Sequence, residues 1–404
     1  MQQHWDSFAA MTQVAIIGGG PAGLIAAGAL AAMHEVHLYE QGRLLGRKFL
    51  VAGDGGLNIT NQAVGEELFD HFTPKAFMQP MLEAFGSADL RKWLAELGVP
   101  TYVGSSGRVF PERTIKPAEV LAAMRERLEK RGVQIHLQHT FVGFDEQVRP
   151  LVEREGERIP VEAQAVLFAL GGASWPKTGS TGGWRAHFEA IGVSTVPFVA
   201  SNCGVECQLP GSLQPHAGKP LKNVVLQTAG RTVRGEVTIT DHGLEGNAIY
   251  PLVPALREAL DQGGAELFID LKPDLSEEQI DRKISDAAWK ERPAALRLDR
   301  PALALFKAFT PLDRYLDGRT WAHDIKHVRI PITALRPLDE AISTVGGIAL
   351  SEVAPDLSLV GHPHLFVAGE MLDTDAPTGG FLLQGAFAMG LWAARGMEAR
   401  VSQA

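Results

Sequence analysis

The sequence lacks the marks of several large classes of protein. Among its 404 residues only Cys203 and Cys207 are cysteines, too few for the disulfide framework of a small secreted protein. No apolar run approaches the roughly 20 residues needed to cross a bilayer. The first ten residues have neither the basic start nor the apolar core of a signal peptide. The sequence therefore predicts a cytoplasmic protein with reduced thiols and no membrane span.

Motifs for metal and hydrolytic chemistry are also missing. The sequence contains no Cys-x-x-Cys or His-Glu-x-x-His pattern, no Gly-x-Ser-x-Gly elbow and no Walker A loop. We therefore predict no metal site. The formal net charge of −9 argues against a nucleic-acid or anionic-lipid partner, although a local basic groove would be compatible with it.

The two cysteines are predicted to be structural. In the strand-like stretch around them they lie on one face, roughly 13 Å apart at about 3.3 Å per residue. That separation is too large for a disulfide bond. We therefore expect both thiols to be buried among apolar side chains rather than to form a redox pair.

The amino-terminal region carries the clearest positive signal. An apolar strand, Val14–Ile17, is followed by Gly18-Gly-Gly-Pro-Ala-Gly23, a helix to about Met33, and a second strand that ends near Glu40. The first glycine of such a turn permits a sharp bend, the second lets the backbone approach a pyrophosphate, and the third lets the helix pack on the strand. The phosphates then lie at the amino terminus of the helix, and the acid accepts hydrogen bonds from ribose hydroxyls. The predicted ADP-binding residues are Gly18, Gly20, Pro21, Ala22, Gly23, Glu40 and Gln41.

Proteins that bind NAD and proteins that bind FAD share this fingerprint, and a second segment distinguishes them. The strand Leu365–Ala368 runs into a Gly-Glu pair, and a Thr-Gly-Gly turn precedes a final helix over Gly379–Arg395. The amino terminus of this helix is suited to face the flavin and to stabilise negative charge on the reduced ring. No second Gly-x-Gly-x-x-Gly follows a strand, which disfavours a separate NAD(P) domain. We therefore predict FAD, with further contacts from Gly171, Gly369, Glu370, Asp373, Gly379 and Gly380.

The pattern of predicted strands and helices changes after Val196, and the pattern of the amino-terminal region resumes near Ser343. Short alternating segments in residues 197–275 predict an inserted β domain, and residues 276–342 predict an inserted helical portion. Residues 1–196 and 343–404 are predicted to form one discontinuous FAD-binding domain. Within it we expect a loop at Gly42–Asn61, helical segments at 76–97 and 116–131, and a hairpin at 141–152.

Taken together, these residues resemble the HI0933-like (BaiN/aminoacetone-oxidase-type) family of FAD-dependent oxidoreductases, as a divergent subgroup. Four blocks carry the resemblance: the glycine turn with Glu40, Gly46-Arg-Lys48 through Asn58-Ile-Thr-Asn61, Leu170–Gly182, and Val345-Gly-Gly-Ile with Ala368–Gly380. The resemblance implies an α/β fold with a Rossmann-like, glutathione-reductase-like FAD-binding domain that is split in sequence. It also implies an inserted antiparallel β-barrel-like portion and a small helical portion.

The resemblance extends to individual residues and has two departures. It implies that Arg47 and Lys48 lie along the cofactor and that the backbone near Phe141 meets the adenine. The family's usual loop reads Gly-Arg-Cys-Asn, whereas this chain has Gly55-Gly-Leu-Asn58. The family's Ser-Gly-Pro in the insert is replaced by Glu245-Gly-Asn247. Chemistry that depends on the missing arginine and thiol is therefore not expected here, and the substrate is expected to differ.

The catalytic residue is not identified by the sequence. Side chains on loops that are expected to reach the flavin ring are Asn58, Asn61, Lys177, Thr178, Asp375 and Gln384. Each of them is equally compatible with a structural hydrogen bond within its loop. Asn58, Lys177 and Asp375 are the catalytic candidates, while His242 lies in a Thr-Asp-His-Gly stretch that favours a turn residue over a general acid.

The leading functional hypothesis is an FAD-dependent oxidoreductase that uses NAD(P)H to reduce a polarised double bond in a small molecule. NAD(P)H would visit transiently, because no domain is dedicated to it, and the sequence leaves open whether electrons come from NAD(P)H or from the substrate. Alternatives are an amine oxidase that passes electrons to oxygen, a reductase of uracil in ribosomal RNA, and a non-catalytic flavin-binding sensor. The sequence does not determine the oligomeric state.

Overall fold

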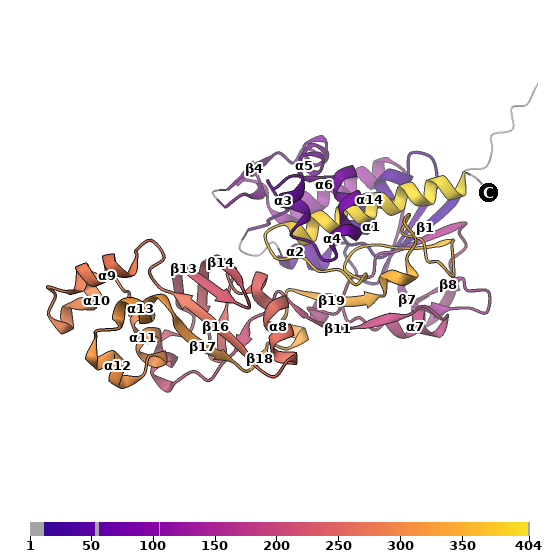
Figure 1. Ribbon diagram of the computed structural model, residues 1–404. Coiled ribbons are helices and arrows are strands. Elements are labelled where there is room, and N and C mark those ends of the chain that lie inside the picture. Colours follow the sequence, from indigo (N-terminus) through magenta and orange to yellow (C-terminus); the bar gives the residue numbers. More distant parts are fainter. Residues whose placement is uncertain (1–11, 53–55, 105, 403–404) are drawn as a thin grey trace, which may run out of the picture. The chain divides into compact units, whose positions relative to one another are not determined.

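The computed structural model describes residues 12–52, 56–104 and 106–402. The amino-terminal residues, for which no signal peptide is expected, and Gly55 of the altered loop lie outside the described residues. The chain divides into two compact units, Met1–Val199 with Ser343–Ala404, and Ala200–Ile342. In Figure 1 the first unit contains both ends of the colour scale, indigo and yellow, and the second runs from magenta to orange.

A five-stranded parallel sheet forms the centre of the first unit. Its strand order is β20 (Leu365–Val367), β10 (Ala165–Phe168), β1 (Gln13–Ile17), β2 (Glu35–Glu40) and β6 (Gln134–Leu137). Every pair of neighbours is parallel, and Val14 to Ile17 are all buried, because both faces of such a sheet are covered. The strand order reverses on the two sides of β1, so a topological switch point lies between β1 and β10.

Two helices from opposite ends of the sequence pack on each other in this unit. Helix α1 (Pro21–Leu30) follows β1, and α14 (Phe381–Val401) closes the chain, beginning and ending later than expected. A Cβ on Gly390 of α14 would lie 2.2 Å from the carbonyl oxygen of Ala22 in α1, so only glycine allows this approach. The labels α1 and α14 lie together in Figure 1.

Smaller elements surround this centre. The predicted hairpin is a three-stranded antiparallel sheet, β7 (Thr140–Phe144), β8 (Pro150–Arg154) and β9 (Glu157–Pro160). The other strands are β3 (Thr60–Asn61), β4 (Thr101–Val103), β5 (Arg108–Pro111), β11 (Thr195–Ser201) and β19 (Ser343–Ile348). The other helices are α2 (Arg47–Ala52), α3 (Glu66–Phe69), α4 (Lys75–Ala84), α5 (Ser87–Glu96), α6 (Pro117–Lys130) and α7 (Arg185–Ala190).

Two predicted segments differ from the structure. The predicted loop at Gly42–Asn61 contains the short helix α2 and the strand β3. The helix was not predicted because its Arg-Lys-Phe-Leu-Val-Ala sequence is short and has glycines on both sides. The predicted helical segment over 76–97 is two helices, α4 and α5, separated at Phe85 and Gly86. Gly86 is the N-cap residue of α5, and its N–H donates to the carboxylate of Asp89 at 2.9 Å, which caps the start of α5.

The second unit is a seven-stranded sheet with helices. The strand order is β17 (Val328–Ile332), β16 (Ala265–Asp270), β13 (Pro220–Thr228), β14 (Arg231–Ile239), β15 (Gly243–Glu245), β12 (Val205–Glu206) and β18 (Ala334–Leu335), and the pairings are antiparallel. The helices are α8 (Val253–Asp261), α9 (Glu277–Ile284), α10 (Arg292–Ala295), α11 (Arg300–Phe309), α12 (Leu312–Asp317) and α13 (Trp321–Lys326). Residues 276–342 are therefore not helical throughout, since they supply two of these strands. Sheet and helices share one core, with Leu267, Phe306 and Trp321 fully buried in it.

The two cysteines belong to this second core. Both are buried and neither is in a disulfide bond, and burial raises the pKa of the Cys207 thiol to about 11. A thiol with so high a pKa carries little reactive thiolate at neutral pH. Within the described parts of the chain, no helix is both long and apolar enough to cross a membrane.

Candidate cofactor and substrate site

The segments that the sequence singled out meet at one edge of the parallel sheet. Gly18 follows β1, Glu40 ends β2, Gly171 lies just beyond β10, and Gly369 lies just beyond β20. The carboxyl ends of parallel strands share one edge, and open α/β sheets bind ligands there at the switch point. The topology thus places four distant segments in one site.

The three glycines of the first turn have different surroundings. A Cβ on Gly18, whose φ is +115°, would lie 2.2 Å from the carbonyl oxygen of Ala169. A Cβ on Gly23 would lie 2.0 Å from the carbonyl oxygen of Gly18. These two glycines are explained by packing within the protein. Gly20 is different, because a Cβ there would meet nothing within 4 Å and its φ of −83° suits any residue.

The open space at Gly20 lies at the start of α1. Gly20 is the N-cap residue of this helix, which has no side-chain cap and no acid in its first turn. Its first N–H groups and the positive end of its dipole are therefore available to an anion. This environment fits the pyrophosphate of a dinucleotide.

The carboxylate of Glu40 is fixed beside the turn. It accepts hydrogen bonds from the N–H of Gly19 at 2.9 Å and from the N–H of Gly42 at 2.7 Å. Each carboxylate oxygen has further acceptor capacity, so the group can still receive ribose hydroxyls. The backbone thus fixes the carboxylate beside the glycine turn, and its contact with a ribose stays a prediction.

The segment Trp175–Gly179 is held by hydrogen bonds from Gln41 and Arg47, two residues that follow Glu40 in the chain. The amide of Gln41 donates to the carbonyl oxygen of Gly179 at 3.0 Å, and Arg47 donates to that of Lys177 at 2.9 Å. The side chain of Lys177 is exposed, and the hydroxyl of Thr178 donates to the carbonyl oxygen of Trp175 at 2.8 Å. Thr178 therefore has a structural role in its loop.

An ion pair connects the two halves of the discontinuous unit. The ammonium of Lys48 lies 2.6 Å from the carboxylate of Glu370 and donates to the hydroxyl of Ser174 at 2.7 Å. The other oxygen of Glu370 accepts from the N–H of Thr344 at 3.0 Å. Both charged side chains are more than half buried, which strengthens the pair over an exposed one. Neither Ser174 nor Thr344 was singled out by the sequence.

The second part of the site lies around the start of α14. Gly380 is the N-cap residue, its φ is +95°, and a Cβ on it would lie 2.3 Å from the carbonyl oxygen of Thr60. No side chain caps the helix, so its amino terminus is available to a ligand with negative charge. The amide of Asn61 donates to the carbonyl oxygen of Gly379 at 3.2 Å, which fixes this turn against β3.

Two predicted substrate contacts are structural instead. Gln384 is fully buried, accepts from the hydroxyl of Thr60 at 2.7 Å and donates to the carbonyl oxygen of Phe85 at 2.8 Å. Asn61 uses its oxygen for the N–H of Ala63 at 3.1 Å as well as its amide for the turn. Both amide groups are thus satisfied by the protein, and neither is available to a substrate.

For the remaining predicted residues the structure gives contacts within the protein. The carboxylate of Asp373 accepts from the N–H of Gly346 at 3.0 Å, and Asp375 forms a backbone bridge with Thr73. The ring of Phe141 packs against that of Phe168, with ring centroids 5.1 Å apart, and the contact of its backbone with an adenine stays a prediction. The turn at His242 is closed by the hydroxyl of Thr240, which accepts from the N–H of Gly243 at 3.1 Å, as expected for a turn residue.

Asn58 has an unsatisfied polar atom. Its side-chain oxygen is buried and has no hydrogen-bond partner among the residues that the structure describes. A buried acceptor without a donor costs about 1–3 kcal/mol, so native proteins rarely retain one without a reason. The atom therefore fits a donor that a bound cofactor or substrate would supply.

Two further side chains near the start of α14 were missed by the sequence analysis. The Nε atom of Arg108 lies 3.9 Å from the position of a Cβ on Gly379, and no acid pairs with it in the described ranges. His71 stacks on Phe381 with ring centroids 3.9 Å apart, and burial lowers the pKa of His71 below its usual value. The signal for Arg108 was one cation at the start of an otherwise apolar Arg-Val-Phe-Pro strand.

The unsatisfied side-chain oxygen of Asn58 predicts that its substitution affects protein stability and ligand binding differently. We expect Asn58→Leu to leave the stability of the cofactor-free protein unchanged or raised by up to about 1 kcal/mol, because no hydrogen bond to the oxygen is lost. Turnover or ligand binding should fall by at least about tenfold, because the donor on the ligand loses its acceptor. Urea unfolding without FAD and steady-state kinetics with FAD measure the two effects. A loss of stability with unchanged kinetics would show a purely structural asparagine.

Fold and site together define a protein of the Rossmann-like, dinucleotide-binding flavoenzyme class. The chain belongs to the family described as the HI0933-like protein Rossmann domain, whose model matches residues 12–396. It is an FAD-dependent oxidoreductase, and the residues around Gly20 and the start of α14 fit that cofactor.

Individual relatives were found over nearly the whole chain. The 3-dehydro-bile acid delta(4,6)-reductase of Clostridium scindens is 27% identical over 96% of this chain and 100% of its own length. A ribosomal RNA dihydrouridine synthase of Escherichia coli is 22% identical over 92% of this chain and 94% of its own length. The solved structure of 3-ketosteroid delta1-dehydrogenase from Sterolibacterium denitrificans is similar in fold, with a TM-score of 0.52, 14% identity, and coverage of 97% of this chain and 100% of that one.

Proposed function

We propose that this protein uses NAD(P)H to reduce a double bond conjugated with a carbonyl group in a small molecule. The observation that carries the proposal is the alignment over 96% of this chain with a relative named as a reductase of 3-dehydro-bile acids. In the reaction NAD(P)H loses two electrons and a proton, a second proton comes from solvent, and the double bond gains two hydrogens.

The residues of the first unit have separate tasks in this proposal. FAD, when bound, supplies the hydride-transfer chemistry. The start of α1 holds the phosphates, and Lys48 with Glu370 joins the two chain segments that flank the cofactor. The start of α14 stabilises negative charge. Arg108 donates to the carbonyl oxygen of the substrate, and the oxygen of Asn58 accepts from an N–H or O–H of the ligand.

Anaerobic reduction of the bound flavin tests the proposal. We expect NADPH or NADH to bleach the flavin absorbance within minutes in the absence of oxygen, and a 3-oxo-4-ene steroid to restore it. Flavin that stays oxidised for hours with both nucleotides would contradict the reductase. If a primary amine bleached it instead, with release of peroxide in air, the protein would be an amine oxidase. If nothing reduced the flavin enzymatically, a sensor would be indicated.

A second candidate is supported by the relatives that are named as ribosomal RNA dihydrouridine synthases. Two features oppose it in this chain: the net charge of −9 and the replacement of the family's Arg-Cys by Gly56-Leu57. The same anaerobic experiment separates the two functions. Reoxidation by structured ribosomal RNA and not by the enone would favour the RNA reductase, and RNA binding should then weaken steeply with salt.

A further inference from the structure

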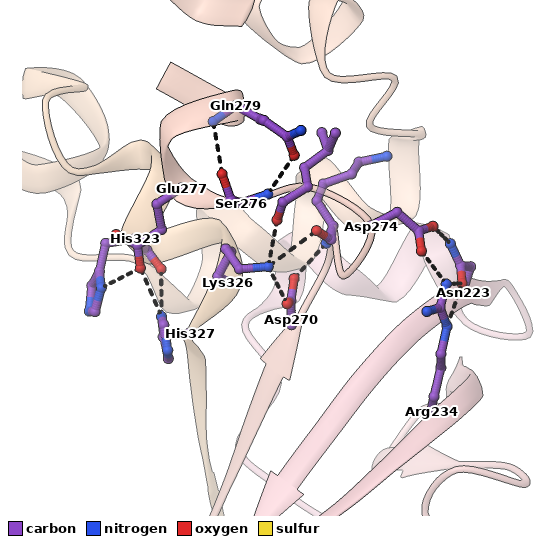
Figure 2. Close-up of polar contacts among 12 residues, drawn as sticks. Asn223, Arg234, Asp270, Asp274, Ser276, Glu277, Gln279, His323, Lys326 and His327 are labelled. Carbon is purple, nitrogen blue, oxygen red and sulfur yellow. Dashed lines mark hydrogen bonds and ion pairs between the residues drawn. The ribbon is translucent and has the colours of Figure 1, made fainter. Parts of the chain in front are cut away.

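Three potential metal ligands converge on the surface of the second unit. Glu277 is the first residue of α9, His323 lies in α13, and His327 directly follows that helix. The Nδ1 atoms of His323 and His327 lie 3.2 Å and 3.9 Å from the same oxygen, Oε1 of Glu277. Figure 2 shows the carboxylate with both rings beside it.

Helical geometry brings the two imidazoles together. Residues four positions apart lie on one face of a helix, and the ring centroids of His323 and His327 are 4.4 Å apart with an interplanar angle of 22°. One ligand atom from each of the three side chains lies within 4.8 Å of the others. The separations of 3.2 and 3.9 Å bracket the roughly 3.3 Å between neighbouring ligands of a tetrahedral ion with bonds of about 2 Å.

The surroundings of the cluster do not oppose a cation. The nearest lysine in sequence, Lys326, is turned away, and its ammonium lies 2.6 Å from the carboxylate of Asp270. That ammonium also donates to two backbone carbonyl oxygens, so its charge is neutralised elsewhere. In Figure 2 the ion pair of Lys326 and Asp270 lies to one side of the two imidazole rings.

The amino terminus of α9, the helix that carries Glu277, is stabilised by a capping box. The hydroxyl of Ser276 accepts from the N–H of Gln279 at 3.2 Å, and the Gln279 side chain accepts from the N–H of Ser276 at 2.9 Å. This capping box fixes the first turn of α9, and therefore the position of the carboxylate, before any ion binds. A ligand on a preformed element loses less conformational entropy on binding.

We propose that Glu277, His323 and His327 bind one divalent transition-metal ion, with zinc, nickel and copper as the chemical class. Two imidazoles and one carboxylate are the ligand types that such ions select, whereas magnesium and calcium prefer oxygen ligands alone. All three side chains are about half exposed, so water completes the coordination. Nδ1 of His327, which lies 3.0 Å from the carbonyl oxygen of His323, exchanges that contact for the metal. The ion then links α9 to α13.

Metal titration of the full-length, FAD-loaded protein tests the site. We expect ZnCl2 to bind with one equivalent per chain in calorimetry, and CoCl2 to give the visible absorption of a low-symmetry site with nitrogen and oxygen ligands. His323→Ala should weaken zinc binding by at least about tenfold, because loss of a ligand costs no less than loss of a group that orients one. Glu277→Gln should also weaken it.

The matched control is His242→Ala, which removes another exposed histidine of the same unit. This variant should bind zinc as the parent does. The proposal is overturned if the parent shows no saturable binding, or if His323→Ala and His242→Ala bind equally well. Because the side chains of His323 and His242 are exposed, both variants should retain the parent's far-ultraviolet circular dichroism. If His323→Ala loses it, the cobalt spectrum of Glu277→Gln decides, and a spectrum like the parent's contradicts the site.

Discussion

Gly20→Ala protein is expected to bind FAD about ten to a hundred times more weakly than the parent while unfolding at the same denaturant concentration when free of FAD. The added methyl group meets nothing within 4 Å in the protein, and the backbone conformation suits alanine. A methyl group forced into a filled site costs about 1–3 kcal/mol, which corresponds to this loss of affinity. The substitution therefore acts only where the pyrophosphate approaches the backbone.

Two measurements separate ligand binding from folding in this experiment. Fluorescence titration of the apoprotein gives the dissociation constant of FAD, and urea unfolding of the same apoprotein gives its stability. The matched control is Gly361→Ala, at another glycine of the first unit with open space around it. It should change neither quantity. Equal FAD affinity in the Gly20 variant and the parent would show that no phosphate approaches this turn.

Gly23→Ala is expected to destabilise the first unit by about 3 kcal/mol or more and to give protein that is purified without yellow colour. Its Cβ would lie 2.0 Å from the carbonyl oxygen of Gly18, which is a backbone atom that cannot turn aside. Overpacking of this kind displaces the helix from the strand and opens the phosphate turn. The unfolding midpoint in urea and the ratio of flavin to protein absorbance measure the effect.

The same substitution elsewhere in α1 provides the control. A Cβ on Gly28 would lie 3.4 Å from a terminal methyl group of Leu128, an ordinary contact with a flexible side chain. Gly28→Ala should therefore keep the flavin and raise stability by up to about 1 kcal/mol, because alanine favours a helix more than glycine does. If both variants were destabilised to the same extent, the close contact of Gly23 with Gly18 would have no special effect on stability.

Features encoded by local sequence could be predicted, and features that depend on distant partners could not. The turn from Gly18 to Gly23 was predicted because the strand, the glycines and the helix that identify it follow one another directly in the sequence. The role of Gln384 was not, because Phe85, which accepts its amide hydrogen, lies 299 residues away. Similarly, nothing in the sequence near Arg108 indicates that the start of α14 lies beside it.

The cluster of Glu277, His323 and His327 was not predicted, although the spacing of the two histidines is visible in the sequence. His323 and His327 are four residues apart, a spacing that a helix converts into a pair of neighbouring rings. The prediction of no metal site considered only motifs whose ligands are all close in sequence. Glu277, the third member, comes from a different helix, and only the packing of α9 against α13 brings it to the pair.

The order of the parallel sheet has a consequence for biosynthesis. Strand β20 is the outermost partner of β10, yet its residues Leu365–Val367 follow the whole second unit in the chain. During translation this edge of β10 therefore has no partner until the whole second unit has been synthesised, and an unpaired apolar edge is a template for aggregation. We therefore expect flavin to bind only after β20 has been synthesised, and a product that ends before residue 365 to be unstable and to be degraded.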